Sequence, residues 1–271
     1  MKRLTLYFLL IFIVISSCKK EDNDGIPPVL PPAETMVIDF NKFTNTEKSA
    51  VPQRMNWIYA ATNVGIWNVL IGTTFAVPVA SFKLAVNNEP VKTGNYTWQW
   101  QYEVDGFTSS YTARLTGTLE VDEVRWEMYI SKEGIDSFDE FMWFEGISKT
   151  DGRSGWWLLY HSPMYQEETV RIDWKKEDVE VGDIKYTYVR ELNNTGQPDP
   201  FNGSSLHYGL KQGLFDAWVH AHTWDQAKQV FNDTQIEWSR TKFNGWVKSP
   251  QFYGDTNWHC WDEQGYDIEC D

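Results

Sequence analysis

The stretch that decides the fold runs from residue 96 to residue 106 and reads YTWQWQYEVDG. Aromatic or apolar side chains at the even positions alternate with polar side chains at the odd positions. Because successive side chains of a β-strand point to opposite faces, this two-residue period predicts a strand with one buried face. The pair Asp105-Gly106 is typical of a tight hairpin turn, since such turns need positive φ at both central residues.

The same pattern continues to the end of the sequence. Between the runs stand turn residues such as Asp151-Gly152, Gly182-Asp183 and Asn202-Gly203. Tight turns leave no room for parallel crossovers, so the strands should form an antiparallel meander. We therefore expect a mainly β fold that closes as a barrel or curls into a half-barrel, with a sandwich as the alternative. The expected strands cover residues 96–105, 107–119, 125–131, 138–147, 156–161, 169–174, 184–190, 204–210, 214–222, 234–240, 243–248 and 258–270.

The segment before residue 96 has a different period. Apolar residues recur at three- and four-residue spacing from Trp57 to Ile71, which predicts a helix. Pro78 suits the first turn of a second helix that continues to Val86. Met36, Ile38 and Phe40 alternate with other residues and suggest a short first strand. We expect one domain over residues 35–271, with one or two N-terminal helices against the sheet.

The N-terminus reads as an export signal. Lys2 and Arg3 precede an apolar run over residues 4–15, and Ser16 and Ser17 lead into Cys18. The sequence Ile15-Ser16-Ser17-Cys18 resembles the lipobox of bacterial lipoproteins. The resemblance implies that residues 1–17 are removed and that Cys18 is acylated; an ordinary signal peptide is the alternative.

The residues after Cys18 add a second resemblance. Cys18–Asp24 reads CKKEDND and is similar to the Lys- and acid-rich export tract of Bacteroidetes-type surface lipoproteins. This resemblance implies an outer-membrane, lipid-anchored protein that faces the cell exterior; the alternative is the periplasmic side. Residues 18–34 contain Pro27, Pro28, Pro31 and Pro32 and predict an extended tether between the acylated cysteine and the domain.

The composition restricts the function classes. The 271 residues are 42% hydrophobic, which is enough for a packed core and excludes wholesale disorder. The formal net charge of −14 argues against a nucleic-acid partner, because phosphate recognition needs a basic surface. Contact with a membrane through the acylated Cys18 is what the lipobox resemblance implies. No cofactor is expected.

Two cysteines remain besides Cys18. Cys260 and Cys270 form an even pair in an exported chain, which predicts a disulfide that staples the C-terminus. The alternatives are two free thiols, or a metal site that includes His259, for which too few ligands lie at a recognised spacing.

The run from Asp216 to His222 carries the best local constellation. In a strand, Trp218, His220 and His222 share one face, and the small apolar residues between them share the other. Two imidazoles on one face could hold a metal ion if His207 on the preceding strand supplied a third ligand, but this motif is weak. The alternatives are a ligand-contacting polar face or a solvated one.

Tryptophan is the most prominent residue type. Tryptophan is common both in buried cores and in sugar-binding sites. Its flat apolar ring stacks on the C–H groups of a sugar, and its N–H donates a hydrogen bond. We expect the 96–104 ladder to line the core. Trp156 and Trp157 should face opposite sides of one strand. The candidate ligand-binding residues are Trp157, Trp218, His220 and Trp258.

The leading hypothesis is a cell-surface binding module for a glycan or a small amphipathic ligand, without catalysis. One alternative is an envelope assembly or structural subunit that docks a protein partner. Another is a carrier of hydrophobic cargo, in which a curled sheet would be lined by the aromatic ladder. The sequence contains no Gly-x-Ser-x-Gly, His-Glu-x-x-His or phosphate-binding loop, so an enzyme is the least favoured class.

Overall fold

The structure is a computed structural model, and it describes residues 25–38, 43, 52–74, 76–105, 109–178 and 180–270. The predicted signal peptide, Cys18 and the Gly106 turn position lie outside these residues. Among the described residues, no helix combines the length and the apolar character needed to cross a membrane.

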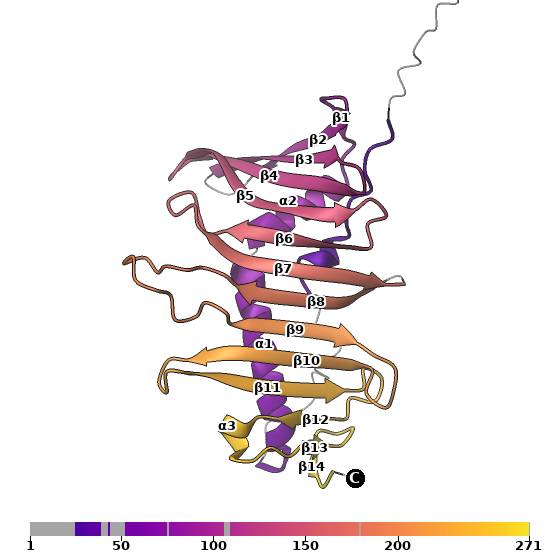
Figure 1. Cartoon of the computed structure of the whole chain (residues 1–271), viewed down its shortest axis with the longest axis vertical. Helices are drawn as coiled ribbons and strands as arrows, with labels where there is room; N and C mark the ends of the chain where they lie inside the picture. The colour runs from indigo at the N-terminus through magenta and orange to yellow at the C-terminus, as the bar shows by residue number, and fades with distance from the viewer. Residues whose placement is uncertain are drawn as a thin grey trace, which may run out of the picture.

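The architecture is one antiparallel sheet of 14 strands in which every strand pairs with its neighbours in chain order (Figure 1). The sheet is open, because β1 and β14 are the two ends of this order and do not pair within the described part of the chain. The mainly β meander is therefore confirmed as a curled half-barrel rather than a closed barrel. The strands are β1 Val91–Lys92, β2 Thr97–Asp105, β3 Ser109–Leu119, β4 Glu123–Gly134, β5 Phe138–Lys149, β6 Ser154–Tyr160, β7 Glu168–Glu177, β8 Glu180–Tyr188, β9 Ser205–Leu210, β10 Ala217–Asp225, β11 Val230–Trp238, β12 Gly245–Lys248, β13 His259–Trp261 and β14 Asp267–Ile268.

Both expected helices are present before the sheet. They are α1 (Met55–Thr74) and α2 (Ala76–Val86), preceded by the short turns η1 (Ala33–Thr35) and η3 (Pro52–Arg54), while α3 (Pro250–Tyr253) follows β12. In Figure 1, α1 runs behind the sheet and across its strands, and α2 continues behind the first strands. The helices therefore form a layer on one side of the sheet.

Hydrogen bonds attach this helical layer to the sheet. The hydroxyl of Tyr59 on α1 lies 2.9 Å from the Ser249 hydroxyl and 3.3 Å from the Thr234 hydroxyl. Tyr102 on β2 donates a hydrogen bond from its hydroxyl to the backbone carbonyl of Ser81 on α2. Phe82 of α2 is fully buried. The face toward the helices is thus the core side, and we call the opposite face the open face.

The aromatic ladder lies on the core side, with one exception. Trp98 and Trp100 are 3% and 2% exposed, as expected for the inner face of β2. Tyr96 precedes β2 and is 66% exposed, so its assignment to the core ladder is wrong. Its backbone carbonyl accepts a hydrogen bond from Leu119, which places it at the sheet end and not in the interior.

The Pro-rich segment contacts the domain as far as the structure describes it. Pro28 and Pro31 are buried, although the sequence places them in the tether. Pro28 lies against β3, where a Cβ on Gly117 would meet its ring at 3.2 Å. Pro28 and Pro31 therefore pack against the domain within the segment that the sequence predicts to be an extended tether.

The expected first strand over residues 36–40 is absent from its described part. Met36 to Ile38 have no strand partner; the backbone N–H of Ile38 donates instead to the Tyr186 hydroxyl at 3.2 Å, and that hydroxyl donates to the Met36 carbonyl at 3.1 Å. A side chain of β8 thus satisfies the backbone groups that a strand ladder would pair. Phe40 lies outside the described residues.

The C-terminal cysteines form the predicted disulfide. Cys260 and Cys270 are bonded, with a Cα–Cα distance of 5.4 Å, and the bond closes the β13–β14 hairpin. The same hairpin supports the start of α1, since the Asp267 carboxylate accepts hydrogen bonds from the backbone N–H groups of Met55 and Asn56.

Candidate functional site

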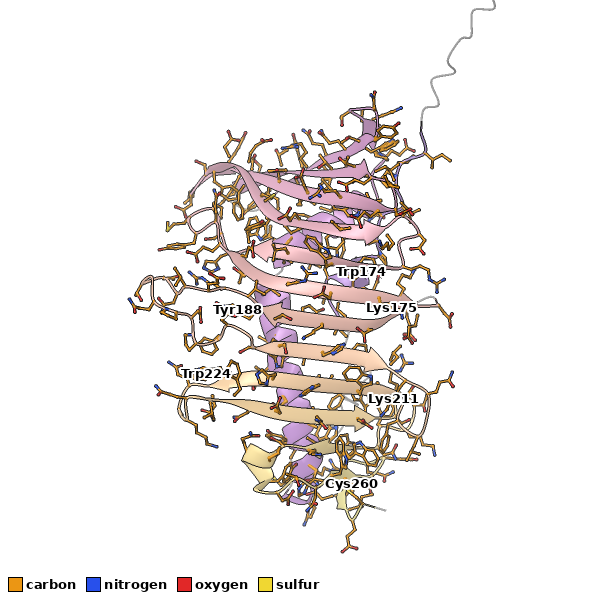
Figure 2. All side chains as sticks on the ribbon, in the orientation of Figure 1. Trp174, Lys175, Tyr188, Lys211, Trp224 and Cys260 are labelled. Atoms are coloured by element: carbon orange, nitrogen blue, oxygen red, sulfur yellow. A yellow bond between two sulfur atoms is a disulfide. The ribbon has the colours of Figure 1, made fainter. Side chains whose placement is uncertain are left out.

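The open face carries the candidate residues of β10. Ala217, Val219 and Ala221 are buried, and the alternate residues Trp218, His220 and His222 are partly exposed. The predicted division of this strand into a small apolar inner face and a polar aromatic outer face is therefore confirmed. Figure 2 shows side chains over the open face, and no described helix lies across it.

The strand register places the candidates of β9 and β10 side by side. His207 is directly opposite His220, and Gly209 is directly opposite Trp218. Asp183 of β8 is opposite Gly209 on the other side. Directly paired residues share a face, so the sheet assembles on its open face a group that is scattered in the sequence.

Trp218 lies flat on the sheet because its partner is glycine. A Cβ built on Gly209 would lie 2.3 Å from Cε2 and Cζ2 of the indole and 2.5 Å from Nε1. The ring therefore occupies the space directly above the Gly209 backbone. The His207 ring meets Trp218 edge-on, with centroids 4.6 Å apart and an interplanar angle of 72°. One indole face is against the sheet, and the other is turned away from it.

Each histidine of this group has a carboxylate partner. His207 Nε2 lies 3.1 Å from both carboxylate oxygens of Asp183. His220 Nε2 and His222 Nδ1 lie 3.1 Å and 2.8 Å from the same oxygen of Asp233. These contacts orient the three imidazoles, of which His207 meets the Trp218 ring and His222 stacks on Phe231.

The weak metal candidates His207, His220 and His222 do not converge. His220 and His222 share Asp233, whereas His207 turns to Asp183. In the parts of the chain that the structure describes, no three His, Cys, Asp or Glu side chains are placed to hold a metal ion.

A second aromatic group adjoins the first on the open face. Glu237 of β11 is opposite Trp218 on one side and opposite Trp246 of β12 on the other. The Trp246 indole donates to the Glu237 carboxylate at 3.0 Å and stacks on Trp258 with centroids 5.1 Å apart. Lys248 lies 5.5 Å from the Trp258 ring centre. The Trp218, Glu237 and Trp246 positions thus form a row across three strands, spaced by about 4.8 Å per strand.

Trp157 does not belong to this site. It lies on the core side of β6, is fully buried, and donates its indole N–H to the Thr35 hydroxyl at 3.0 Å. A ligand on the open face cannot reach this ring, so we remove Trp157 from the ligand-binding candidates. Its neighbour Trp156 faces the open side, where the Arg171 guanidinium lies 4.6 Å from the ring centre.

The structure therefore places Trp218 and His220 side by side on β10, and Trp258, which precedes β13, joins the group through its stacking on Trp246. Sequence reasoning missed Gly209, Asp183, Asp233, Glu237 and Trp246, which complete the group. One signal was available for Trp246: it alternates with the apolar Val247 in a run that was expected to be a strand.

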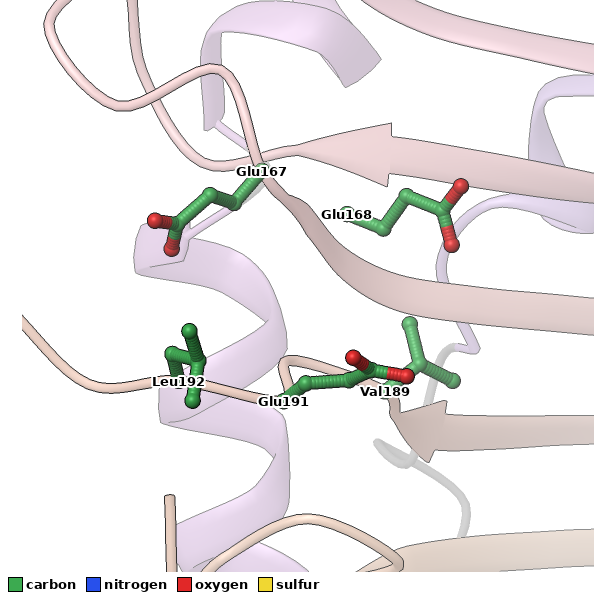
Figure 3. A pocket seen from close by; sticks show the side chains of 5 residues that line it. All are labelled: Glu167, Glu168, Val189, Glu191 and Leu192. Atoms are coloured by element: carbon green, nitrogen blue, oxygen red, sulfur yellow. The ribbon is translucent and has the colours of Figure 1, made fainter. Parts of the chain in front are cut away.

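An open pocket lies beyond the ends of β7 and β8, away from this group (Figure 3). Its volume is about 350 Å³, and it is lined by Glu167, Glu168, Val189, Glu191 and Leu192. Arg190 is nearly buried beside it and donates to the Glu167 carboxylate at 2.8 Å. None of its described lining residues is aromatic, so this lining does not offer the stacking surface found at Trp218.

Comparison with protein-family models, with curated proteins and with solved structures gives no match to this chain.

The shared carboxylate of Asp233 makes a pH-dependent contribution to stability. Partial burial alone would raise the pKa of Asp233, but hydrogen bonds from His222 and His220 outweigh it and lower this pKa below its usual range. The ordinary pKa of an Asp carboxyl is about 4. Because the pKa of Asp233 is lower than this in the folded state, its ionised carboxylate stabilises the fold at pH values above about 4. This contribution is lost as the pH falls through the lowered pKa.

We therefore expect Asp233→Asn to lower the free energy of unfolding at pH 6 and to have a smaller effect at pH 2. The loss should be below about 1 kcal/mol, because the pair is half exposed and solvent screens it. Urea unfolding at both pH values measures it, with Glu103→Gln as a control that removes an exposed carboxylate on β2. Equal losses at both pH values would contradict the assignment.

Proposed function

We propose that this chain is a lipid-anchored binding module that captures a glycan or a small amphipathic ligand on its open face at Trp218. The observation that carries the proposal is the indole of Trp218, which lies flat over Gly209 with its other side turned away from the sheet. Sugar rings stack on such a surface through their C–H groups, while adjacent polar groups bind the hydroxyls.

The neighbours of Trp218 supply those polar groups. The nearest polar residues are His207 on β9, His220 on β10 and Glu237 on β11. The carboxylates of Asp183 and Asp233 orient the two imidazoles. Carboxylates accept hydrogen bonds, and imidazole both donates and accepts. This set suits hydroxyl-rich ligands, because Asp183 and Asp233 are acceptors beside the imidazoles and Glu237 is held between Lys211 and the Trp246 indole.

The cargo-carrier alternative has less support. A cargo carrier needs a large apolar cavity along the aromatic ladder. Trp98 and Trp100 are almost completely buried, and the Tyr102 hydroxyl is hydrogen-bonded to the backbone carbonyl of Ser81 on α2. The N-terminal helices occupy the side of the sheet where cargo would lie. A catalytic function also has less support, because the residues at Trp218 lie on a sheet face, whereas catalysis favours groups that converge in a cleft.

The anchor remains part of the proposal. Cys18 and the export tract lie outside the described residues, and the lipobox resemblance supports acylation. Pro28 packs against β3 and lies ten residues after Cys18, so the binding domain would stand within about 35 Å of the lipid.

The test is retention on a panel of immobilised polysaccharides, followed by titration of the best ligand with the mature chain carrying Cys18→Ser. We expect Trp218→Ala to weaken binding at least about tenfold, which corresponds to about 1.4 kcal/mol. Gly209→Ala should also weaken binding, because the new Cβ displaces the ring without removing it.

Trp156→Ala is the matched control, since it removes another indole of the open face four strands away from Trp218. It should leave binding unchanged, and all three variants should keep the circular dichroism of the parent. Unchanged binding in Trp218→Ala, or no retention of the parent on a broad panel, would contradict the proposal.

A further inference from the structure

The helical layer is almost free of charge in a strongly charged protein. α1 has 20 residues without a single Asp, Glu, Lys or Arg, and the 11 residues of α2 contain only Lys83. Charged residues make up 23% of the whole chain, and its formal net charge is −14. α1 carries polar residues such as the exposed Thr62, but no charge on any side. A long uncharged helix with exposed apolar side chains is suited to burial or to contact with lipid.

Only one side of α1 is buried by the sheet. Trp57, Ala60 and Val64 lie in the core, whereas Ile66 and Val69 on the other side are 55% and 63% exposed. The outward side of the layer continues at both ends of these helices. Met55 begins α1 and is 46% exposed, Leu84 of α2 is 37% exposed, and Phe252 stacks on Tyr59 and is 49% exposed.

The lipid-bearing end of the chain enters the domain beside this layer. Gly25 and Pro27 line one open pocket together with Glu89 and Pro90, which follow directly after α2. The segment from Cys18 to Asp24 has seven residues and spans at most about 25 Å. Ile26, at the same entry point, is 86% exposed. An acylated Cys18 would therefore keep the lipid surface close to the α2 end of the helical layer.

We infer that the outward side of α1 and α2 rests on the lipid surface that holds Cys18, so that the open face points away from the membrane. This inference rests on the lipid anchor proposed above. An uncharged, apolar surface can enter the interfacial region without desolvating carboxylates. The one charged side chain of these helices, Lys83, is exposed and has the sign that suits lipid phosphate.

The test places a single fluorescent label on the acylated full-length protein bound to zwitterionic vesicles that contain nitroxide-labelled lipid. Ile66→Cys and Leu84→Cys provide labelling sites on the helical layer, and Gln235→Cys on the open face is the matched control. The acylated and disulfide-bonded cysteines leave the new thiol free for labelling. We expect lipid quenching at residues 66 and 84 to be at least about threefold stronger than at residue 235.

Flotation of the vesicles separates failure of the anchor from failure of this inference. Protein absent from the floated fraction would contradict the anchor and the orientation together. Protein that floats but shows equal quenching at residues 66 and 235 would overturn the orientation alone. The orientation would also be overturned if the label at residue 66 became shielded from solvent only when native envelope proteins were added. That result would favour a protein partner for the helical layer.

A second variant tests the contact without changing the anchor. Adding Ile66→Glu to the Leu84→Cys protein introduces a charge into the contact, so quenching at residue 84 should fall at least about twofold while flotation stays complete. Unchanged quenching at residue 84 would contradict the inference.

Discussion

Trp157→Ala is expected to lower the free energy of unfolding by about 3–5 kcal/mol, the usual range for truncating a buried tryptophan. The ring is fully buried on β6 and meets Phe82 of α2 and Phe144 of β5 edge-on, with centroids 5.4 Å and 5.5 Å away. Its N–H donates to Thr35 of η1. The substitution therefore leaves a cavity where the N-terminal segment, the helical layer and the sheet meet, and urea unfolding measures the loss.

The adjacent residue provides the matched control. Trp156 has the same side chain on the same strand but faces the open side, where its main partner is the Arg171 guanidinium. Trp156→Ala should lower the free energy of unfolding by only about 1 kcal/mol, the size of an exposed cation–π contact. Similar losses for the two variants would contradict the assignment of opposite faces to these neighbours.

The inner and outer faces of many strands were predictable because side-chain alternation is a local property. In β2 and β10, polar and apolar residues alternate cleanly, and the structure has the expected inner and outer faces. In β6, the residues at positions 156–159 are all apolar. The sequence therefore shows that Trp156 and Trp157 face opposite sides of the sheet, but it does not show which of them faces the core. This ambiguity is why the sequence indicated that one of the two tryptophans faces outward and yet led to the choice of Trp157.

Turn signals were less reliable where glycine serves another purpose. Gly182 and Asp183 were expected to form a turn, but both lie within β8, and the turn comes earlier, with Asp178 at a φ of 54°. A Cβ on Gly182 would meet the Glu177 side chain at 2.6 Å. A side chain at position 182 would therefore crowd Glu177, beside an irregular step in the β7–β8 register.

The candidate site was only partly predictable, because its geometry depends on strand register. The sequence placed Trp218 and His220 on one face, since they lie on one strand. It gave no means to place Gly209 beneath Trp218 or Asp183 beside His207, because these contacts join different strands. Register is fixed by the whole set of buried side chains, so such neighbours follow only from the folded sheet.

Breaking the Cys260–Cys270 disulfide is expected to lower the free energy of unfolding by about 2–3 kcal/mol, according to the chain-entropy model for a loop of this length. For a protein of this size, the loss corresponds to a decrease in melting temperature of roughly 5–10 °C. Calorimetry of the Cys260→Ser, Cys270→Ser double variant, and of the reduced parent, measures the effect. An unchanged melting temperature in both would contradict a stabilising role for the bond.

The disulfide should also stabilise the helical layer, because its hairpin holds Asp267 at the start of α1. The Asp267 carboxylate accepts hydrogen bonds at 3.0 Å and 2.9 Å from two backbone N–H groups of the first turn, where a helix has no internal acceptors. Asp267→Ala alone should cost about 1 kcal/mol, the usual value of a helix cap. In the disulfide-free background it should cost clearly less, because residues that act through one structural unit are not additive. Equal costs in both backgrounds would show that the hairpin positions Asp267 without the disulfide.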